Sequence, residues 1–105
     1  MVLIYSTFES EKDAQKVAGT LLKKKLNGCA VFFPAQSMYW WKGAITTGPE
    51  TILLMKTTKS LAVKAKKEIA LKHPYEVPCI LDWPAGVNTS YLNWLIGETE
   101  KHKNK

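Results

Sequence analysis

A chain of 105 residues, 46% of them hydrophobic, has the size and composition of one globular domain. Its net charge of +6 comes from 15 lysines without a single arginine, the residue that supplies most bidentate base contacts, so we expect no specific nucleic-acid partner. Two cysteines are too few for a disulfide scaffold and are typical of a reducing compartment. The chain shows no basic leader and no apolar run near the ~20 residues of a membrane span. We therefore expect a cytoplasmic protein with a single domain over residues 1–105.

The first half of the chain predicts a strand, a helix and a long hairpin. Apolar β-formers predict a strand over residues 1–7. A helix is expected to start after Ser10, whose hydroxyl is a good N-cap, and to end at Asn27-Gly28. The hairpin is predicted from strands at residues 29–42 and 51–57, with turn chemistry at Gly43 and residues 46–49.

The second half predicts a helix, a strand and a short final helix. Ser60 is the expected cap of the helix, which must end by Lys72 or His73 because the residue before Pro74 is pushed out of the α region. The later elements are a strand over 77–83, a short helix from Asn88 or Thr89, and a frayed tail over 99–105.

The order β-α-β-β-α-β is the split βαβ pattern of an α+β fold. Right-handed crossovers favour one antiparallel sheet with both long helices on one face. The first and third strands should then be central, and the second and fourth should form opposite edges.

The pair Trp40-Trp41 predicts assembly. Successive side chains of a strand point to opposite faces, so the helices can cover only one of the two indole rings. Each ring is worth ~4–6 kcal/mol at most when buried. Part of the missing cover is expected from the final helix through Tyr91 and Trp94, and the rest from copies of the chain that join unlike sheet edges into a ring.

Four segments in chain order resemble the CutA divalent-cation tolerance proteins. They are "PAQSMYWWKG" at 34–43, "ETILLMKT" at 50–57, "HPYEVP" at 73–78 and "YLNWL" at 91–95. The resemblance implies a ferredoxin-like split β-α-β subunit, a homotrimer, and a role in tolerance of copper or other divalent cations. It also implies kinship with the trimeric PII regulators.

The resemblance also suggests metal ligands. By position these are His73 in the H-P-Y connector and Ser6 late in the first strand. Ser6 differs from the cysteine of some family members, and a hydroxyl is a poorer ligand for soft copper than a thiolate. Cys79 stands where glutamate is usual, and Val31 stands where many members have asparagine. We expect no tightly bound cofactor.

Each candidate site has a simpler structural interpretation. The connector "HPYEVP" is stiffened by two prolines, so its main role can be mechanical. Cys29 and Cys79 are expected on opposite sheet edges within one subunit, where the simple interpretation is two buried apolar thiols. If subunits join unlike edges into a ring, the two thiols of neighbouring subunits could form a soft metal site or a reversible disulfide. Lys56 in an apolar strand requires a partner, for which Glu50 and Glu76 are the candidates, or it lines a cleft that receives an anion.

We therefore predict a homotrimeric metal-responsive protein that is not an enzyme. The alternatives are a PII-like trimer that binds a small anionic effector between subunits and signals to a protein partner, and a purely structural assembly. The residues expected at the inter-subunit cleft or interface are Ser37, Tyr39, Trp41, Glu50, Lys56, Tyr75, Glu76, Tyr91 and Trp94.

Overall fold

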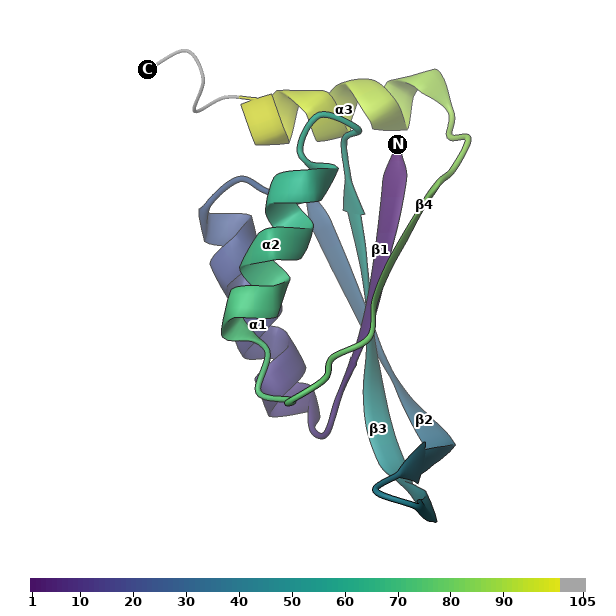
Figure 1. Ribbon diagram of the computed structural model, residues 1–105. Helices are drawn as coiled ribbons and strands as arrows, with labels where there is room; N and C mark the ends of the chain where they lie inside the picture. The colour runs from purple at the N-terminus through teal and green to yellow at the C-terminus, as the bar shows by residue number, and fades with distance from the viewer. Residues whose placement is uncertain (101–105) are drawn as a thin grey trace.

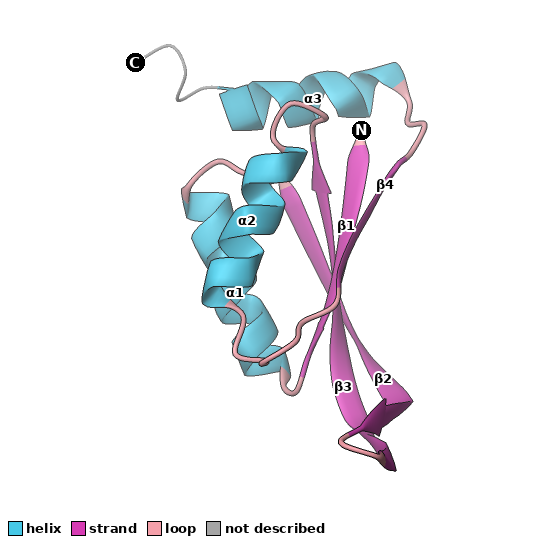
Figure 2. Cartoon of the chain, in the orientation of Figure 1, coloured by secondary structure: helices cyan, strands magenta, loops and turns pink. Residues whose placement is uncertain are grey.

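A four-stranded antiparallel sheet carries two helices on one face, as the computed structural model of residues 1–100 shows (Figures 1 and 2). The elements are β1 (Val2–Phe8), α1 (Glu11–Lys23), β2 (Cys29–Trp41), β3 (Ala44–Thr57), α2 (Ala62–Lys72), β4 (Ile80–Pro84) and α3 (Thr89–Glu100). The strand order is β2-β3-β1-β4, so the prediction of β1 and β3 as central strands is confirmed. No helix within residues 1–100 is long and apolar enough to cross a bilayer.

Strand alternation separates a core face from an open face. Along β1, Ile4, Ser6 and Phe8 are fully buried under α1 and α2, whereas Tyr5 and Thr7 point to the face without helices. β3 alternates in the same way. The helices complete the core with small and aliphatic side chains: Ala14, Val17, Ala18, Leu21, Ala62, Ala65 and Ile69.

The first helix begins as predicted but ends earlier. The Ser10 hydroxyl accepts a hydrogen bond from the Asp13 amide at 3.2 Å, which confirms the N-cap. At the other end Lys25 adopts a φ of 61°, and the Leu26 amide donates to the carbonyl of Leu21 at 3.0 Å. This is a Schellman cap, so the prediction that Asn27-Gly28 ends the helix is wrong.

The hairpin is longer than predicted because its turn has only two residues. Lys42 and Gly43 have φ values of 51° and 81°, and Trp41 pairs directly with Ala44. Positive φ at both central positions is the type I′ geometry that matches strand twist. Residues 46–49 are therefore strand, not turn. Residues 35–50 extend beyond the last β1 pair, Phe8 with Thr51, and we call them the arm.

The second half also differs from prediction at its boundaries. Ser60 does not cap α2, because its hydroxyl lies 3.2 Å from that of Thr58 and the N-cap position is Leu61. β4 starts at Ile80, after the connector, rather than at residue 77. α3 runs to Glu100, and Thr99 is fully buried with its hydroxyl donating to Leu95, so this part of the predicted tail is helical. Residues 101–105 of that tail lie outside the described part.

The final helix does not cover the tryptophans of the hairpin. α3 lies across one end of the sheet, and the arm projects from the other end (Figure 1). Trp40 is 71% exposed and Trp41 is 40% exposed. Within residues 1–100, α3 therefore does not provide the cover that the sequence predicted for these rings.

Candidate functional site

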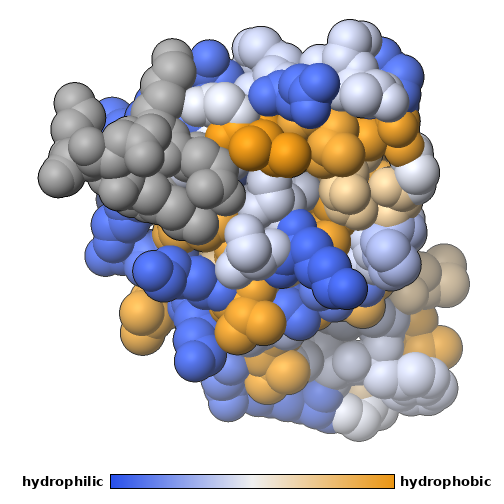
Figure 3. All heavy atoms as spheres, turned by 90° about the horizontal axis from the view of Figure 1, so that it is seen from above, coloured by the Kyte–Doolittle hydropathy of each residue, from blue (hydrophilic) through white to orange (hydrophobic). Residues whose placement is uncertain are grey.

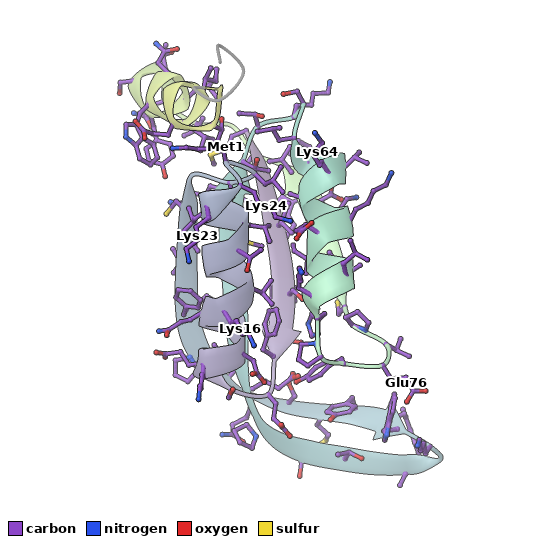
Figure 4. All side chains as sticks on the ribbon, turned by 90° about the vertical axis from the view of Figure 1, so that its left-hand side faces the viewer. Met1, Lys16, Lys23, Lys24, Lys64 and Glu76 are labelled. Carbon is purple, nitrogen blue, oxygen red and sulfur yellow. The ribbon has the colours of Figure 1, made fainter. Side chains whose placement is uncertain are left out.

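A cleft of about 690 Å³ lies between the arm, β1 and the connector of residues 74–79. Its walls are formed by Tyr5, Thr7, Ser37, Met38, Tyr39, Trp40, Trp41, Glu50, Tyr75, Glu76, Val77 and Cys79. Figure 4 places Glu76 on the connector, beside the arm. The set contains two carboxylates, and none of these twelve residues is lysine, arginine or histidine. The cleft is thus acidic in a chain with a net charge of +6.

Glu50 is the centre of the polar contacts in the cleft. The Ser37 hydroxyl donates to Oε1, and the Tyr75 hydroxyl donates to Oε2 at 2.8 Å. The hairpin register explains the first contact, because Glu50 faces Ala35 and Ser37 is the next residue on the same face. One donor on each oxygen holds the carboxylate in a single orientation.

Two tyrosines at the cleft are kept in their neutral form. The pKa of Tyr75 is raised strongly by burial, by its hydrogen bond to Glu50 and by the negative charge of that carboxylate. Burial also raises the pKa of Tyr5, with smaller contributions from the nearby Cys79 and Glu50. Both phenols therefore remain hydrogen-bond donors at neutral pH.

His73 lies behind the cleft rather than in its wall. Its Nε2 donates to the Thr7 carbonyl at 2.9 Å, and its Nδ1 accepts from the Tyr75 amide at 3.1 Å. The ring is buried and stacks on Phe8 at a centroid distance of 4.1 Å. Burial lowers the pKa of His73, against smaller contributions from the Thr7 carbonyl, Glu50 and Asp13 that raise it. The imidazole thus positions Tyr75, and metal binding would require exchange of one of these two hydrogen bonds.

The other predicted metal ligands do not meet His73 in one site. Ser6 faces the core side and donates to the Cys79 carbonyl at 2.7 Å. Cys79 lines the cleft. Cys29 lies on β2 at the opposite edge of the sheet, where its backbone is in register with Lys56 of β3. Among residues 1–100 there is no group of three or more His, Cys, Asp and Glu side chains that could hold a metal ion. A site that uses these ligands across subunits stays a prediction.

The predicted interface residues divide into two groups. Six line the cleft, namely Ser37, Tyr39, Trp41, Glu50, Tyr75 and Glu76. Lys56, Tyr91 and Trp94 lie at the α3 end, where the Lys56 ammonium sits 5.1 Å from the Tyr91 ring centre and Tyr91 is 5.3 Å from Trp94. Within the subunit Glu50 is therefore not the partner of Lys56, because its carboxylate accepts hydrogen bonds from Ser37 and Tyr75 instead, and a pairing between subunits stays a prediction.

Sequence reasoning missed several cleft residues: Tyr5, Thr7, Met38, Trp40 and Val77. The alternation of β1 carried the signal for two of them. With Ile4, Ser6 and Phe8 assigned to the core, Tyr5 and Thr7 must face the open side, which is the side that Glu50 shares.

The fold and the cleft together define a class: a ferredoxin-like α+β domain with a projecting hairpin arm and an acidic, aromatic cleft at its base. Residues 2–98 match the family model of the CutA1 divalent ion tolerance protein. The chain is 40% identical over 102 residues to the divalent-cation tolerance protein CutA of Pyrococcus horikoshii, covering 96% of this chain and 100% of that protein. It is also 40% identical to CutA of Thermotoga maritima over 90% of this chain and 95% of the relative. The chain belongs to the CutA1 divalent ion tolerance family.

Solved structures agree with this assignment. The crystal structure of CutA1 from Pyrococcus horikoshii superposes with a TM-score of 0.90 at 38% identity, covering 93% of this chain and 97% of that chain. CutA from Synechococcus elongatus gives a TM-score of 0.89 at 29% identity, covering 93% and 88%. A PII-like CutA from Nostoc shares the fold with a TM-score of 0.87 at 24% identity, covering 94% and 97%. The family resemblance and the α+β fold inferred from the sequence are confirmed.

Proposed function

We propose that the protein acts in divalent-cation tolerance as a homotrimer that binds a divalent cation at Glu50. One observation carries the proposal: the only charged side chains in the wall of the 690 Å³ cleft are the carboxylates of Glu50 and Glu76. Such a wall attracts cations. Glu50 would supply a carboxylate oxygen, with water or groups from a neighbouring copy in the remaining positions.

The distribution of charge over the molecule supports a cation rather than an anion. Lys16 and Lys23 lie on α1, Lys24 is the C-cap of that helix and Lys64 lies on α2, in the helical layer away from the cleft (Figure 4). A small anionic effector, the alternative that the sequence allows, would meet repulsion from Glu50. Lys56, the lysine expected to receive that anion, is at the α3 end of the sheet.

The proposed assembly rests on apolar surface that the subunit leaves uncovered. On the open face Phe33, Leu81 and Trp83 are 41%, 50% and 41% exposed. Met38, Trp40 and Ile45 are exposed on the arm, and Ile96 is exposed at the α3 end, where apolar groups lie among hydrophilic ones (Figure 3). Exposed apolar surface of this extent is typical of an interface. Three copies is the number that the family resemblance implies.

A charge placed on the open face tests the assembly. Leu81→Asp would place an unpaired carboxylate in the proposed interface and should weaken association at least ~30-fold. Leu71→Asp is the matched control, because Leu71 is exposed on α2, outside the open face. Light scattering should report three times 11.8 kDa for the wild type and for Leu71→Asp. A monomeric wild type would contradict the proposed trimer.

Metal titration of the full chain by calorimetry tests the cation site. Glu50→Gln keeps the shape of the side chain but removes the charge, and should weaken Mn²⁺ binding at least ~tenfold. Glu11→Gln is the control, since it makes the same change on α1, where the Glu11 carboxylate contacts only Gln15 among the contacts seen. Unchanged Mn²⁺ binding in Glu50→Gln would overturn this site.

The same titration addresses copper. Oxygen ligands suit hard cations, whereas copper favours imidazole and thiolate. If copper binds through the ligands predicted from sequence, His73→Gln and Cys79→Ser should each weaken Cu²⁺ binding, while Glu50→Gln should leave it intact. If only Glu50→Gln weakens Cu²⁺ binding, copper binds at Glu50, at the same site as Mn²⁺.

A further inference from the structure

The cleft is larger and more aromatic than a metal ion requires. Its volume of about 690 Å³ falls within the ~300–1,000 Å³ that is usual for small organic ligands. A hard divalent ion such as Mg²⁺ or Ca²⁺ is held by oxygen atoms at ~2.0–2.6 Å and leaves such a wall unused. Aromatic side chains form much of that wall: Tyr5, Tyr39, Trp40, Trp41 and Tyr75.

The charge of the wall and its aromatic surface select the same kind of ligand. Glu50 and Glu76 are the charged residues of the lining and give the cleft negative charge, whereas Lys42, whose ammonium lies against the Trp41 ring, is not a lining residue. The faces of indole and phenol rings also carry negative potential, which attracts cations within ~6 Å of the ring centre. An organic cation with an apolar body would use both features at once.

One ring of the wall already holds an ammonium group. The Lys42 Nζ lies 5.7 Å from the Trp41 ring centre. Tyr39 and Trp41 are two residues apart on β2, so their side chains leave the strand on the same side as Ser37 and Glu50. The negatively polarised rings and the carboxylate therefore share one face of the arm.

We propose that this cleft binds a methylated or quaternary ammonium cation. Tyr39 and Trp41 would contact its methyl groups, and Glu50 would supply the countercharge. A quaternary nitrogen has no N–H group to satisfy, so it needs only ring faces and nearby negative charge. The inference rests on the proposed function in one respect, namely that Glu50 attracts a cation; it adds the chemical class of the ligand.

Choline and its uncharged isostere 3,3-dimethylbutan-1-ol are the probes that test the charge. Binding to the full chain in its native assembly is followed by NMR of the indole Nε1–H signals. Choline should shift the Trp41 signal, and the isostere should bind at least ~fivefold more weakly because it lacks the cation–π attraction. Equal affinity for the two probes would overturn the proposal.

Two tryptophan variants test the location. Trp41→Leu should weaken choline binding ~fivefold or more. Trp94→Leu is the matched control, because Trp94 is exposed to a similar degree, 45% against 40%, but lies on α3 at the other end of the sheet. Equal losses in the two variants would contradict a site on the arm.

The outcomes separate this inference from the proposed function. Mn²⁺ binding that depends on Glu50, without choline binding, would overturn the ammonium site alone. Choline binding that depends on Trp41 and Glu50, without Mn²⁺ binding, would support the ammonium site and overturn the metal site. Loss of both ligands in Glu50→Gln supports both, with Trp41→Leu affecting choline only.

Discussion

The phenol of Tyr75 donates a hydrogen bond to Oε2 of Glu50 at 2.8 Å and so joins the connector to the arm. The two residues are 25 positions apart, and α2 lies between them in the chain. His73 fixes the other end of this link, because its Nδ1 accepts the Tyr75 amide while its Nε2 donates to β1. The shape of the cleft therefore depends on a chain of contacts from β1 through His73 and Tyr75 to Glu50.

Tyr75→Phe should loosen the arm. The change removes one hydrogen bond to a carboxylate, which is worth ~1–3 kcal/mol of the free energy of unfolding. Guanidinium unfolding followed by circular dichroism measures the loss. Tyr39→Phe removes a hydroxyl from the same cleft without affecting the hydrogen bonds of Glu50, and it serves as the control. A Tyr75→Phe variant no less stable than Tyr39→Phe would show that the link contributes nothing.

The protein should lose stability in mild acid through His73. The pKa of this buried ring is lowered from 6.5 in the folded chain, chiefly by burial. As pH falls through 6.5 the unfolded chain takes up a proton that the folded chain resists, so unfolding is favoured until the folded pKa is reached.

Above pH ~7 both states are neutral at this site and the effect vanishes. The expected slope is at most ~1.4 kcal/mol per pH unit, measured from unfolding curves between pH ~7 and ~5. His73→Gln should flatten that part of the profile even if it lowers stability throughout. A variant with the wild-type slope would assign the acid sensitivity to other groups.

The arrangement of strands follows from sequence, whereas the cleft follows only in part. The order of elements and the apolar alternation of β1 and β3 were enough to predict the sheet, its central strands and its helical face. Six of the nine residues expected at an inter-subunit interface line the cleft of the single subunit, and their place in an interface stays a prediction. The pairing of Tyr75 with Glu50 was not predicted, since it depends on a contact across two elements.

The errors at element boundaries have local causes that composition hides. Lys25 adopts the left-handed conformation that usually falls to glycine or asparagine, so the true end of α1 carries no obvious signal. Residues 46–49 include Gly48 and Pro49, which are typical of turns, yet they continue β3 because Lys42 and Gly43 already complete the turn. Within the subunit an aromatic ring, not a carboxylate, faces the Lys56 ammonium group, and the apolar pattern of β3 carries no signal for that contact.

Gly28→Ala should displace α3. A Cβ at Gly28 would collide with the Leu95 side chain, which is fully buried at the middle of that helix. The expected cost is ~1–3 kcal/mol of the free energy of unfolding, as for other overpacked sites. Gly97→Ala is the control, because its Cβ meets nothing within 4 Å and alanine favours a helix.

A second substitution identifies the cause of the Gly28 effect. Leu95→Ala removes the colliding atoms, so the double variant should lose less than the sum of the two single losses. Additive losses would mean that Gly28 matters for some reason other than its contact with α3.

Oxidation of the thiols tests whether Cys29 and Cys79 meet between copies. In one subunit Cys29 lies on the edge strand β2 and Cys79 directly precedes the other edge strand, β4, with β3 and β1 between them. A disulfide needs the two Cα atoms within ~7 Å, so a bond within one chain is excluded by the sheet.

A ring that joins unlike edges would bring the two thiols of neighbouring subunits together, and mild oxidant should then give reducible covalent dimers and trimers on a denaturing gel. Cys29→Ser and Cys79→Ser should each abolish these species if the bond joins the two different residues. Covalent dimers that persist in Cys29→Ser would instead reveal Cys79–Cys79 bonds, because the exposed Cys79 can react with its own copies.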